Sequence, residues 1–305
     1  ILMANIFDDR LRDFIKYIRN ERQYSHHTAK AYEKDLTEFN RFIIEYYGDD
    51  ILDYNSVDKL GIRHYLGKKF EEGASPRTVA RRLASIKSFF KYLFQTNSIK
   101  KNPSIHVKTP KIGKKLPSFI NDNIMDSLLS LPDRSNPKGL RDKAIMELFY
   151  ATGIRLSELV DLNVGDINFS QNLIRVRGKG NKERLVPFGN TALTAIKDYG
   201  AKYGISFKSQ DNQLPLFCSV IGKRISVRTI QNRINGYLTQ VTVGERLGPH
   251  MLRHSFATAM IDHGADIRAV QEFLGHASLS STQIYTHIKP EKIKEAFKKS
   301  HPHGS

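Results

Sequence analysis

The chain has 305 residues, and its 48 lysines and arginines against 31 aspartates and glutamates give it a formal net charge of +17. This positive excess predicts an anionic partner, and the length allows two domains with separate cores. No apolar run approaches the roughly 20 residues that span a bilayer, no secretory pattern opens the chain, and the single cysteine, Cys218, excludes an internal disulfide. We therefore expect a cytoplasmic protein without a membrane partner, in which Cys218 is a small buried hydrophobe.

Four amphipathic helices are expected between residue 7 and about residue 105. The second has Ser25 as its cap and ends before Gly48, and the fourth has Ser75 as its cap with Pro76 in its first turn. Together they predict a small helical DNA-binding domain, residues 1–108, whose second and fourth helices face DNA. The helices are expected over residues 8–21, 25–48, 56–73 and 75–95.

Positive charge is concentrated in residues 73–121, which contain eleven lysines and arginines and no aspartate or glutamate. Solvation is the ordinary explanation of such residues, but 49 residues without an acid favour a surface that meets phosphates. The stretch begins with the fourth helix, whose arginines and lysines lie largely off its apolar stripe, and ends with an extended basic linker, residues 109–116. The expected DNA contacts are Arg77, Arg81, Arg82, Lys87, Lys91, Lys114 and Lys115.

A second domain, residues 117–305, is expected to be mainly helical with a small antiparallel sheet. A buried helix over residues 141–153 stops at Thr152 and Gly153, and the next, residues 154–162, carries Arg155 in its first turn. Residues 172–188 form two alternating runs around a turn at 178–181, the pattern of a β-hairpin. Further helices are expected over residues 228–238, 250–264 and 267–275.

The helix at 250–264 separates apolar from polar side chains. Leu252, Phe256 and Ala259 share its buried side. His250 and Arg253, three residues apart, share the opposite side. This pair lies in one of four local sequence strings whose residue types suit phosphodiester chemistry. Their six candidate catalytic residues are Arg155, Lys179, His250, Arg253, His276 and Tyr285.

Cleaving a phosphodiester requires charge neutralisation, a nucleophile and a proton donor. The planar guanidiniums of Arg155 and Arg253 match the non-bridging oxygens. Tyr285 is the candidate covalent nucleophile, since neighbouring cations lower the pKa of a phenol. Because the guanidiniums supply the positive charge, neither a metal nor another cofactor is expected.

The remaining roles concern proton transfer. Lys179, at the hairpin tip, is expected to protonate the departing 5′ oxygen, with Lys182 and Arg184 as alternatives. His250 and His276 can relay protons or hydrogen-bond the phosphate near neutral pH. Each residue alone has an ordinary structural explanation, so the prediction depends on all six together.

The strings GIRLSEL, GKGNKER, HMLRH, LGHAS and IYTH, in this order, resemble the tyrosine recombinase (phage-integrase-like) family, most closely its bacterial Xer branch. The resemblance implies an N-terminal helical domain and a catalytic domain forming a C-shaped clamp on double-stranded DNA. It implies cleavage through a 3′-phosphotyrosyl bond, a Holliday junction, and a homo- or hetero-tetramer on two sites. The resemblance also implies a second recombinase or a DNA-translocase activator as a further partner. It implies that the protein resolves chromosome or plasmid dimers.

The resemblance also bears on Glu158 and on the C-terminal tail. Glu158, three residues after Arg155, matches an acidic position that orients the site, with an ordinary glutamate on a helix surface as the alternative. Residues 289–300 can form a short helix with Ile293, Ala296 and Phe297 on one side. By resemblance this stripe docks on a neighbouring protomer, although packing on its own domain is the simpler alternative.

Four other functions remain as alternatives. An integrase of a mobile element shares the chemistry but usually carries an additional arm-binding domain, and only about six residues precede the first expected helix. A type IB topoisomerase uses similar residues without strand exchange, and a non-catalytic DNA-binding protein would not need His250, Arg253 and Tyr285 together. A zinc protein is disfavoured because the eleven histidines lack cysteine pairs and the HExxH pattern.

Overall fold

The computed structural model separates the chain into two compact units, Ile1–Leu116 and Pro117–Ser305. Each unit has its own hydrophobic core. None of the helices in the described part of the chain is long and apolar enough to cross a membrane. The structure describes residues 2–48, 53–113, 120–178, 183–205, 207, 213–242, 248–275, 297 and 299–303.

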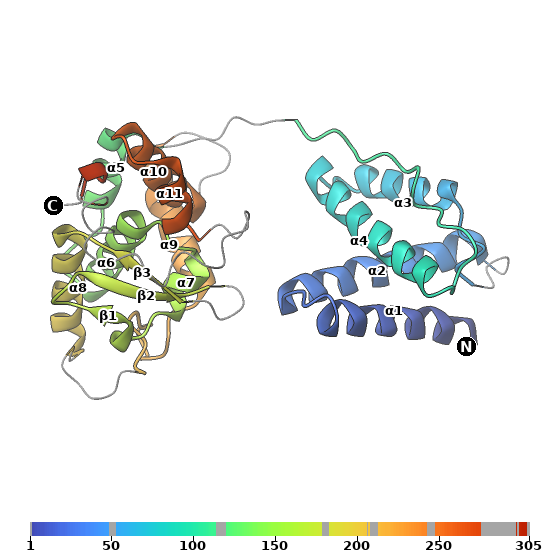
Figure 1. The fold of residues 1–305 in the computed structure, drawn as a ribbon, viewed down its shortest axis with the longest axis horizontal. Helices are drawn as coiled ribbons and strands as arrows, with labels where there is room; N and C mark the ends of the chain where they lie inside the picture. Colours follow the sequence, from blue (N-terminus) through green and yellow to red (C-terminus); the bar gives the residue numbers. More distant parts are fainter. Residues whose placement is uncertain are drawn as a thin grey trace. The chain divides into compact units, whose positions relative to one another are not determined.

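The described residues of the N-terminal unit form four helices, as expected (Figure 1). Ser25 and Ser75 cap the second and fourth through hydrogen bonds from the backbone N–H groups of Thr28 and Thr78. The first helix begins at Leu2, before the position expected for it, and the third begins only after its cap, Asp58. The helices are α1 (Leu2–Asn20), α2 (His26–Tyr47), α3 (Lys59–Glu71) and α4 (Pro76–Gln95).

Aromatic side chains fill the core of this unit. Phe39 lies edge-on to Tyr65 with ring centroids 5.2 Å apart, and Tyr54 lies edge-on to Phe89 at 5.0 Å. Edge-to-face contacts of this kind add to the stabilisation that burial provides. The chain after α4 contributes Val107 to the same core. The unit therefore ends beyond its last helix.

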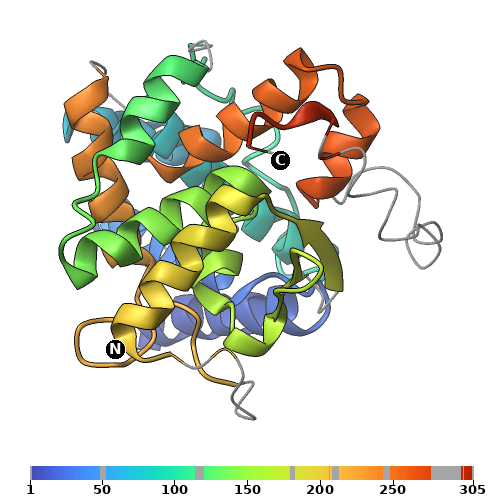
Figure 2. The ribbon, with the colours of Figure 1, turned by 90° about the vertical axis from the view of Figure 1, so that its left-hand side faces the viewer.

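The C-terminal unit combines helices with a three-stranded antiparallel sheet of order β1-β2-β3, which confirms the expected α+β class. In Figures 1 and 2 α8 packs along α6. Of these elements α5, α8 and β1 were not anticipated from the sequence. The helices are α5 (Asp122–Ser130), α6 (Pro137–Thr152), α7 (Leu156–Asp161), α8 (Asn190–Tyr203), α9 (Val227–Val241), α10 (Pro249–Asp262) and α11 (Ile267–Phe273); the strands are β1 (Ile167–Asn168), β2 (Leu173–Arg177) and β3 (Glu183–Pro187).

The junction between α6 and α7 is set by a close approach of the chain to α10. Gly153 ends α6 in the left-handed region, with φ of 56°. A Cβ at this position would lie 2.3 Å from a ring carbon of Phe256, so only glycine fits. The expected break at Thr152 and Gly153 is confirmed, but Arg155 is the N-cap of α7 rather than a residue of its first turn. Its side chain therefore leaves the helix at the end nearest α10.

Cys218 is half-buried rather than fully buried, which corrects the sequence-based expectation. Its backbone N–H donates to the hydroxyl oxygen of Tyr199 at 2.9 Å. Burial raises the pKa of the Cys218 thiol. A thiol with little thiolate character is a poor nucleophile, so Cys218 serves packing.

The C-terminal tail packs into the unit to which it belongs. Phe297 is 2% exposed within the C-terminal core, and its ring stacks on His301 with centroids 4.9 Å apart. His301 in turn contacts the rings of Tyr150 and Phe256. In this single chain the residue therefore packs on its own domain, the simpler of the two alternatives, and docking on a neighbouring protomer in an assembly stays a prediction. Ile293 and Ala296 lie outside the described residues.

Phe297→Ala should lower the free energy of unfolding of the C-terminal unit by about 3–5 kcal/mol, since it leaves a cavity lined by aromatic rings. Urea denaturation of the whole protein measures the change. Ile261→Ala on α10 is the control, because that side chain is 42% exposed and its truncation should have little effect. Equal stability of wild type and Phe297→Ala would contradict the packing described above.

Candidate active site

Three arginines from separate elements meet at the C-terminal end of α11. Arg155 comes from the start of α7, Arg184 from β3 and Arg253 from α10. Each donates to one of three successive carbonyl oxygens. Arg184 Nε donates to Phe273 O at 3.2 Å, Arg253 Nη2 to Leu274 O at 2.6 Å, and Arg155 Nη2 to Gly275 O at 2.8 Å. These unsatisfied helix-end carbonyls are natural partners of guanidinium groups.

Glu158, which is 6% exposed, joins two of the arginines. Its Oε1 accepts from Arg155 Nη1 at 2.8 Å and its Oε2 from the backbone N–H of Arg155 at 2.8 Å. Arg184 donates to both oxygens, Nη2 to Oε2 at 2.8 Å and Nη1 to Oε1 at 3.2 Å. Burial alone would raise the pKa of Glu158, but the hydrogen bonds from Arg184 and Arg155 outweigh it and hold that pKa below its ordinary value. Glu158 is therefore a carboxylate and orients Arg155.

The charges of this cluster do not cancel. Three guanidiniums surround one carboxylate, which leaves two positive charges. Burial and the neighbouring charge of Arg155 lower the pKa of Arg253 to about 10. Arg253 still carries its proton near neutral pH, and its Nη1 also donates to Gly153 O. A partly buried cation beside a second cation favours an anion at this place.

Of the six candidate residues, the structure brings Arg155 and Arg253 to adjacent carbonyls. His250 is exposed in the first turn of α10, three residues before Arg253. Lys179, His276 and Tyr285 lie outside the described residues, as do Lys182, Lys114 and Lys115.

Arg184 has a role that was not anticipated. It was considered as an alternative to Lys179 for proton donation, but its guanidinium is bound to Glu158 and Phe273 O, and its side chain is only 18% exposed. The signal was present in the strand pattern. In β3 the alternate residue Val186 is buried, so Arg184 lies on the inward side of the strand. An arginine at an inward position predicts an acidic partner.

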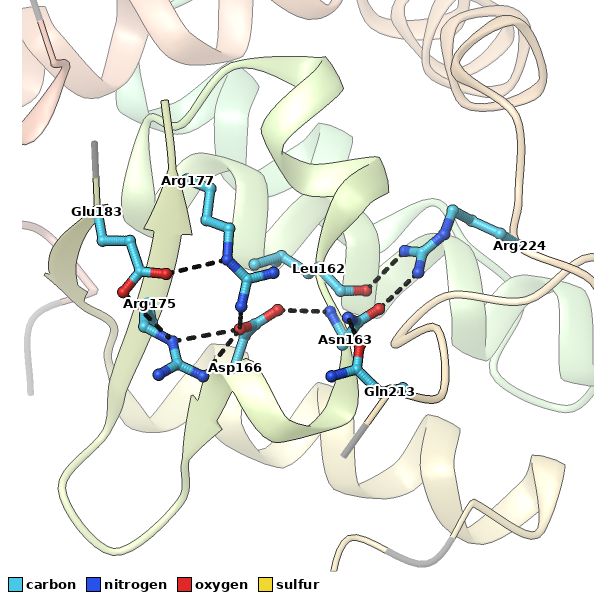
Figure 3. Close-up of polar contacts among 8 residues, drawn as sticks. All are labelled: Leu162, Asn163, Asp166, Arg175, Arg177, Glu183, Gln213 and Arg224. Carbon is cyan, nitrogen blue, oxygen red and sulfur yellow. Dashed lines mark hydrogen bonds and ion pairs between the residues drawn. The ribbon is translucent and has the colours of Figure 1, made fainter. Parts of the chain in front are cut away.

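The hairpin that leads toward Lys179 is held by a second polar cluster (Figure 3). In β2, Ile174 and Val176 are buried while Arg175 and Arg177 point outward. Both arginines reach Asp166 Oδ1, at 3.3 and 3.4 Å, from the 3-10 helix η2 (Val164–Asp166). Cross-strand pairing with β3 fixes the register of the hairpin. The base of the hairpin is therefore rigidly placed relative to Arg184.

Two of the arginines expected to face DNA on α4 have acidic partners within the N-terminal unit. Arg82 is only 15% exposed and donates to Glu38 at 2.6 Å and to the hydroxyl of Tyr65 at 2.7 Å. Arg81 pairs with Asp35, a buried carboxylate of α2. Arg82 thus lies in an internal network, because α2 presents acids to the arginines of α4 across their interface. Arg77 and Lys91 are exposed and Lys87 is half-buried, so these remain candidates for phosphate contact.

Comparison with known proteins places the chain in a family. The model of the phage integrase family matches residues 118–292, and that of its N-terminal SAM-like domain matches residues 11–97. The chain belongs to the phage integrase family. A tyrosine recombinase XerC of Natranaerobius thermophilus is 41% identical over 298 residues, covering 96% of this chain and 99% of that protein. A tyrosine recombinase XerD of Listeria monocytogenes is 38% identical over 299 residues, covering 97% and 99%. The expected enzyme, a tyrosine recombinase of the Xer type, is confirmed.

Solved structures share the fold of this phage integrase family member. The XerH site-specific recombinase bound to a palindromic difH substrate, a post-cleavage complex, has a TM-score of 0.68 at 23% identity, covering 94% of this chain and 83% of that chain. A lambda integrase dimer bound to a COC′ core site has a TM-score of 0.67 at 16% identity, covering 91% and 98%. The expected combination of an N-terminal helical domain and an integrase catalytic domain is thereby confirmed.

Glu158→Gln should destabilise the C-terminal unit by about 3 kcal/mol near neutral pH, because two arginines lose a buried charged partner. The folded-state pKa of Glu158 is lowered, so the stabilisation is present above its unfolded value of about 4.3 and is lost as the pH falls through the folded-state pKa. Urea denaturation at neutral pH and at several pH values below about 4.3 tests this.

The control for this series is Asp262→Asn, which removes an exposed carboxylate from α10. The difference in free energy of unfolding between wild type and Glu158→Gln should become smaller in acid, while the control should have the stability of wild type at every pH. A gap that stays constant with pH would mean that the charge of Glu158 contributes nothing.

Proposed function

We propose that this protein recombines DNA at specific sites and resolves chromosome or plasmid dimers, with Arg155 and Arg253 as the residues that hold the scissile phosphate. The observation that carries the proposal is the cluster of three arginines around one carboxylate, with two positive charges in excess. A phosphodiester supplies a negative charge and two non-bridging oxygens, which match this excess. Two relatives at 41% and 38% identity, named tyrosine recombinases XerC and XerD, support it independently.

The two arginines would act on charge that develops during cleavage. Each guanidinium already donates at least one hydrogen bond to a backbone carbonyl of the protein, and this bond fixes the plane of the guanidinium before DNA binds. Donors fixed in advance stabilise a transition state without further reorganisation. In this proposal the hydroxyl oxygen of Tyr285 attacks phosphorus and the bond to the 5′ oxygen breaks. The products are a 3′-phosphotyrosyl bond and a free 5′ hydroxyl.

Proton transfer completes the step. Lys179, on the hairpin anchored by Arg175 and Arg177, would give a proton to the departing 5′ oxygen. His250 and His276 would relay the proton of Tyr285 or hydrogen-bond the phosphate. Attack by the 5′ hydroxyl of another strand then reverses the chemistry and restores the tyrosine. The free energy of the broken bond is retained in the phosphotyrosyl link, so no nucleotide is needed.

The assembly belongs to the same proposal. The XerH and lambda integrase structures hold DNA, and one lambda integrase structure is a tetramer bound to a Holliday junction. This chain would likewise act in the cytoplasm as a homo- or hetero-tetramer on two sites, with a second recombinase or a DNA-translocase activator as further partners. Residues 1–108 would grip the DNA core, 109–116 would link the domains, and 117–305 would carry the chemistry.

Tyr285→Phe should bind a duplex recombination site as tightly as wild type but form no covalent adduct, because it lacks only the attacking oxygen. The measurement is a denaturing gel of protein incubated with a nicked suicide substrate in EDTA. Wild type should form the adduct under these conditions, since arginines rather than a metal hold the phosphate. The control is Tyr203→Phe, whose hydroxyl is on α8. An adduct with Tyr285→Phe would refute the assignment.

Arg77→Gln combined with Lys91→Gln should weaken binding to all duplexes and flatten its salt dependence. The two side chains are exposed and lie about 40° apart around α4, so both can reach one backbone. Each lost phosphate contact reduces the slope of log affinity against log salt by about 0.9. Lys16→Gln combined with Arg19→Gln is the control, an equal loss of charge from exposed positions on α1. An unchanged slope in the double variant would show that this face meets solvent.

A further inference from the structure

We infer that Arg184 is a positioning residue for DNA cleavage: by holding both oxygens of Glu158 and the end of α11, it keeps Arg155 available to the phosphate. This inference rests on the proposed function, in which Arg155 binds the scissile phosphate. Arg184 itself would not touch DNA. It acts through Glu158 and through the backbone next to Arg155.

The hydrogen bonds of Arg184 use three of its nitrogens on two elements. Its Nη1 and Nη2 form a fork on Glu158, and its Nε donates to Phe273 O at 3.2 Å. Glu158 belongs to α7 and Phe273 ends α11, while Arg184 belongs to β3. One guanidinium therefore fixes the distance between the helix that carries Arg155 and the helix end that Arg155 contacts. A lysine is a point donor and cannot reproduce this fork.

Competition for the carboxylate explains why Arg155 depends on Arg184. Arg155 Nη1 shares Oε1 of Glu158 with Arg184, and its Nη2 is turned to Gly275 O. Without Arg184, the lone pairs of a buried carboxylate would lack donors, and a burial cost follows for each one left unpaired. The nearest remaining donor is Arg155, which would close on Glu158 as a bidentate pair. Its second guanidinium nitrogen would then turn away from the phosphate.

Gly275 contacts both Arg155 and Arg184, and so links the two arginines through the backbone. Its carbonyl accepts from Arg155, and the guanidinium of Arg184 occupies the space that a side chain at this position would need. A Cβ on Gly275 would be 3.0 Å from Cζ and 3.1 Å from Nη1 of Arg184. The guanidinium is bound on three sides and cannot yield as a loose side chain would. The backbone partner of Arg155 and the side chain of Arg184 thus occupy one packed unit.

The first test compares wild type with Arg184→Gln and Arg184→Lys in single-turnover cleavage of a suicide DNA substrate. Both variants should bind the duplex within about twofold of wild type, since phosphate contacts elsewhere dominate affinity. Cleavage should slow by about 100-fold in Arg184→Gln, the scale of a misplaced catalytic group, and less in Arg184→Lys. Circular dichroism and urea denaturation identify a variant that fails to fold. In that case Arg184→Lys and the Gly275 variant below carry the test.

The second measurement separates positioning from a structural role. Glu158 is faced by Arg155 on its own helix, by Arg184 from β3 and, through space, by Arg253 from α10. Removing Arg184 takes away a donor that favours the carboxylate, so Glu158 gains its proton at a higher pH, and the neutral acid no longer fixes the orientation of Arg155. The acid limb of the cleavage rate should therefore move to higher pH in Arg184→Gln. A role confined to folding would leave the position of this limb unchanged.

Gly275→Ala provides a matched pair with Gly264→Ala. Both glycines have positive φ, 65° and 82°, so both substitutions introduce similar backbone strain. Only Gly275 has Arg184 within contact distance, whereas nothing lies within 4 Å of a Cβ at Gly264. Gly275→Ala should slow cleavage by at least tenfold more than Gly264→Ala, on the scale of a misplaced catalytic group. Equal rates would overturn the inference.

The outcomes distinguish this inference from the proposed function. If wild type forms no covalent adduct, the proposed function fails. If wild type forms it and Arg184→Gln cleaves at the same rate with the same acid limb, only the positioning role fails. A double variant, Arg184→Gln with Arg155→Lys, gives one further check. It should cleave no more slowly than Arg155→Lys alone, and independent additive losses would overturn the dependence on Arg155.

Discussion

The active region of this phage integrase family member depends on one shared carboxylate. Glu158 is buried, accepts hydrogen bonds from Arg155 and Arg184, and completes the cap of α7 through the backbone of Arg155. Removing one partner of such a buried charged group costs about 3–5 kcal/mol, a large share of the stability of a domain. The same contacts set the direction of Arg155. Fold and site are therefore stabilised by the same few hydrogen bonds.

The arrangement is electrostatically incomplete. Arg253 remains charged although burial and the charge of Arg155 lower its pKa to about 10. The helix-end carbonyls of residues 273–275 compensate part of this charge, since the negative end of the α11 dipole lies there. Carbonyl dipoles compensate less than a full negative charge does. A bound phosphate would supply the missing negative charge. The same excess of positive charge therefore raises the energy of the empty site and makes the site selective for an anion.

The N-terminal unit uses the same residue types for a different purpose. Arg82, Glu38 and Lys69 form a network between α2, α3 and α4, with Lys69 at 2.5 Å from Glu38. Glu72 also accepts from Lys69, at 2.6 Å, so two carboxylates offset the two cations and this network adds little to the field around the protein. Exposed cations such as Arg77 and Lys91 are the ones that a polyanion meets. A count of lysines and arginines along a basic stretch therefore overestimates the surface available to phosphate.

Sequence by itself determined the helices other than α5 and α8, the Ser25 and Ser75 caps, the hairpin and the break at Gly153. Capping and amphipathic periodicity depend on residues within about four positions of one another. It also identified Arg155, His250 and Arg253 as candidates through their local strings. Only the tertiary structure decided which charges pair and where apolar side chains are buried. Arg82 pairs with Glu38, 44 residues away in the sequence, and Arg184 pairs with Glu158, 26 residues away. Phe297 is buried in its own unit. Such contacts join distant segments, and their partners are selected by which side chains the packed backbone brings within hydrogen-bonding distance.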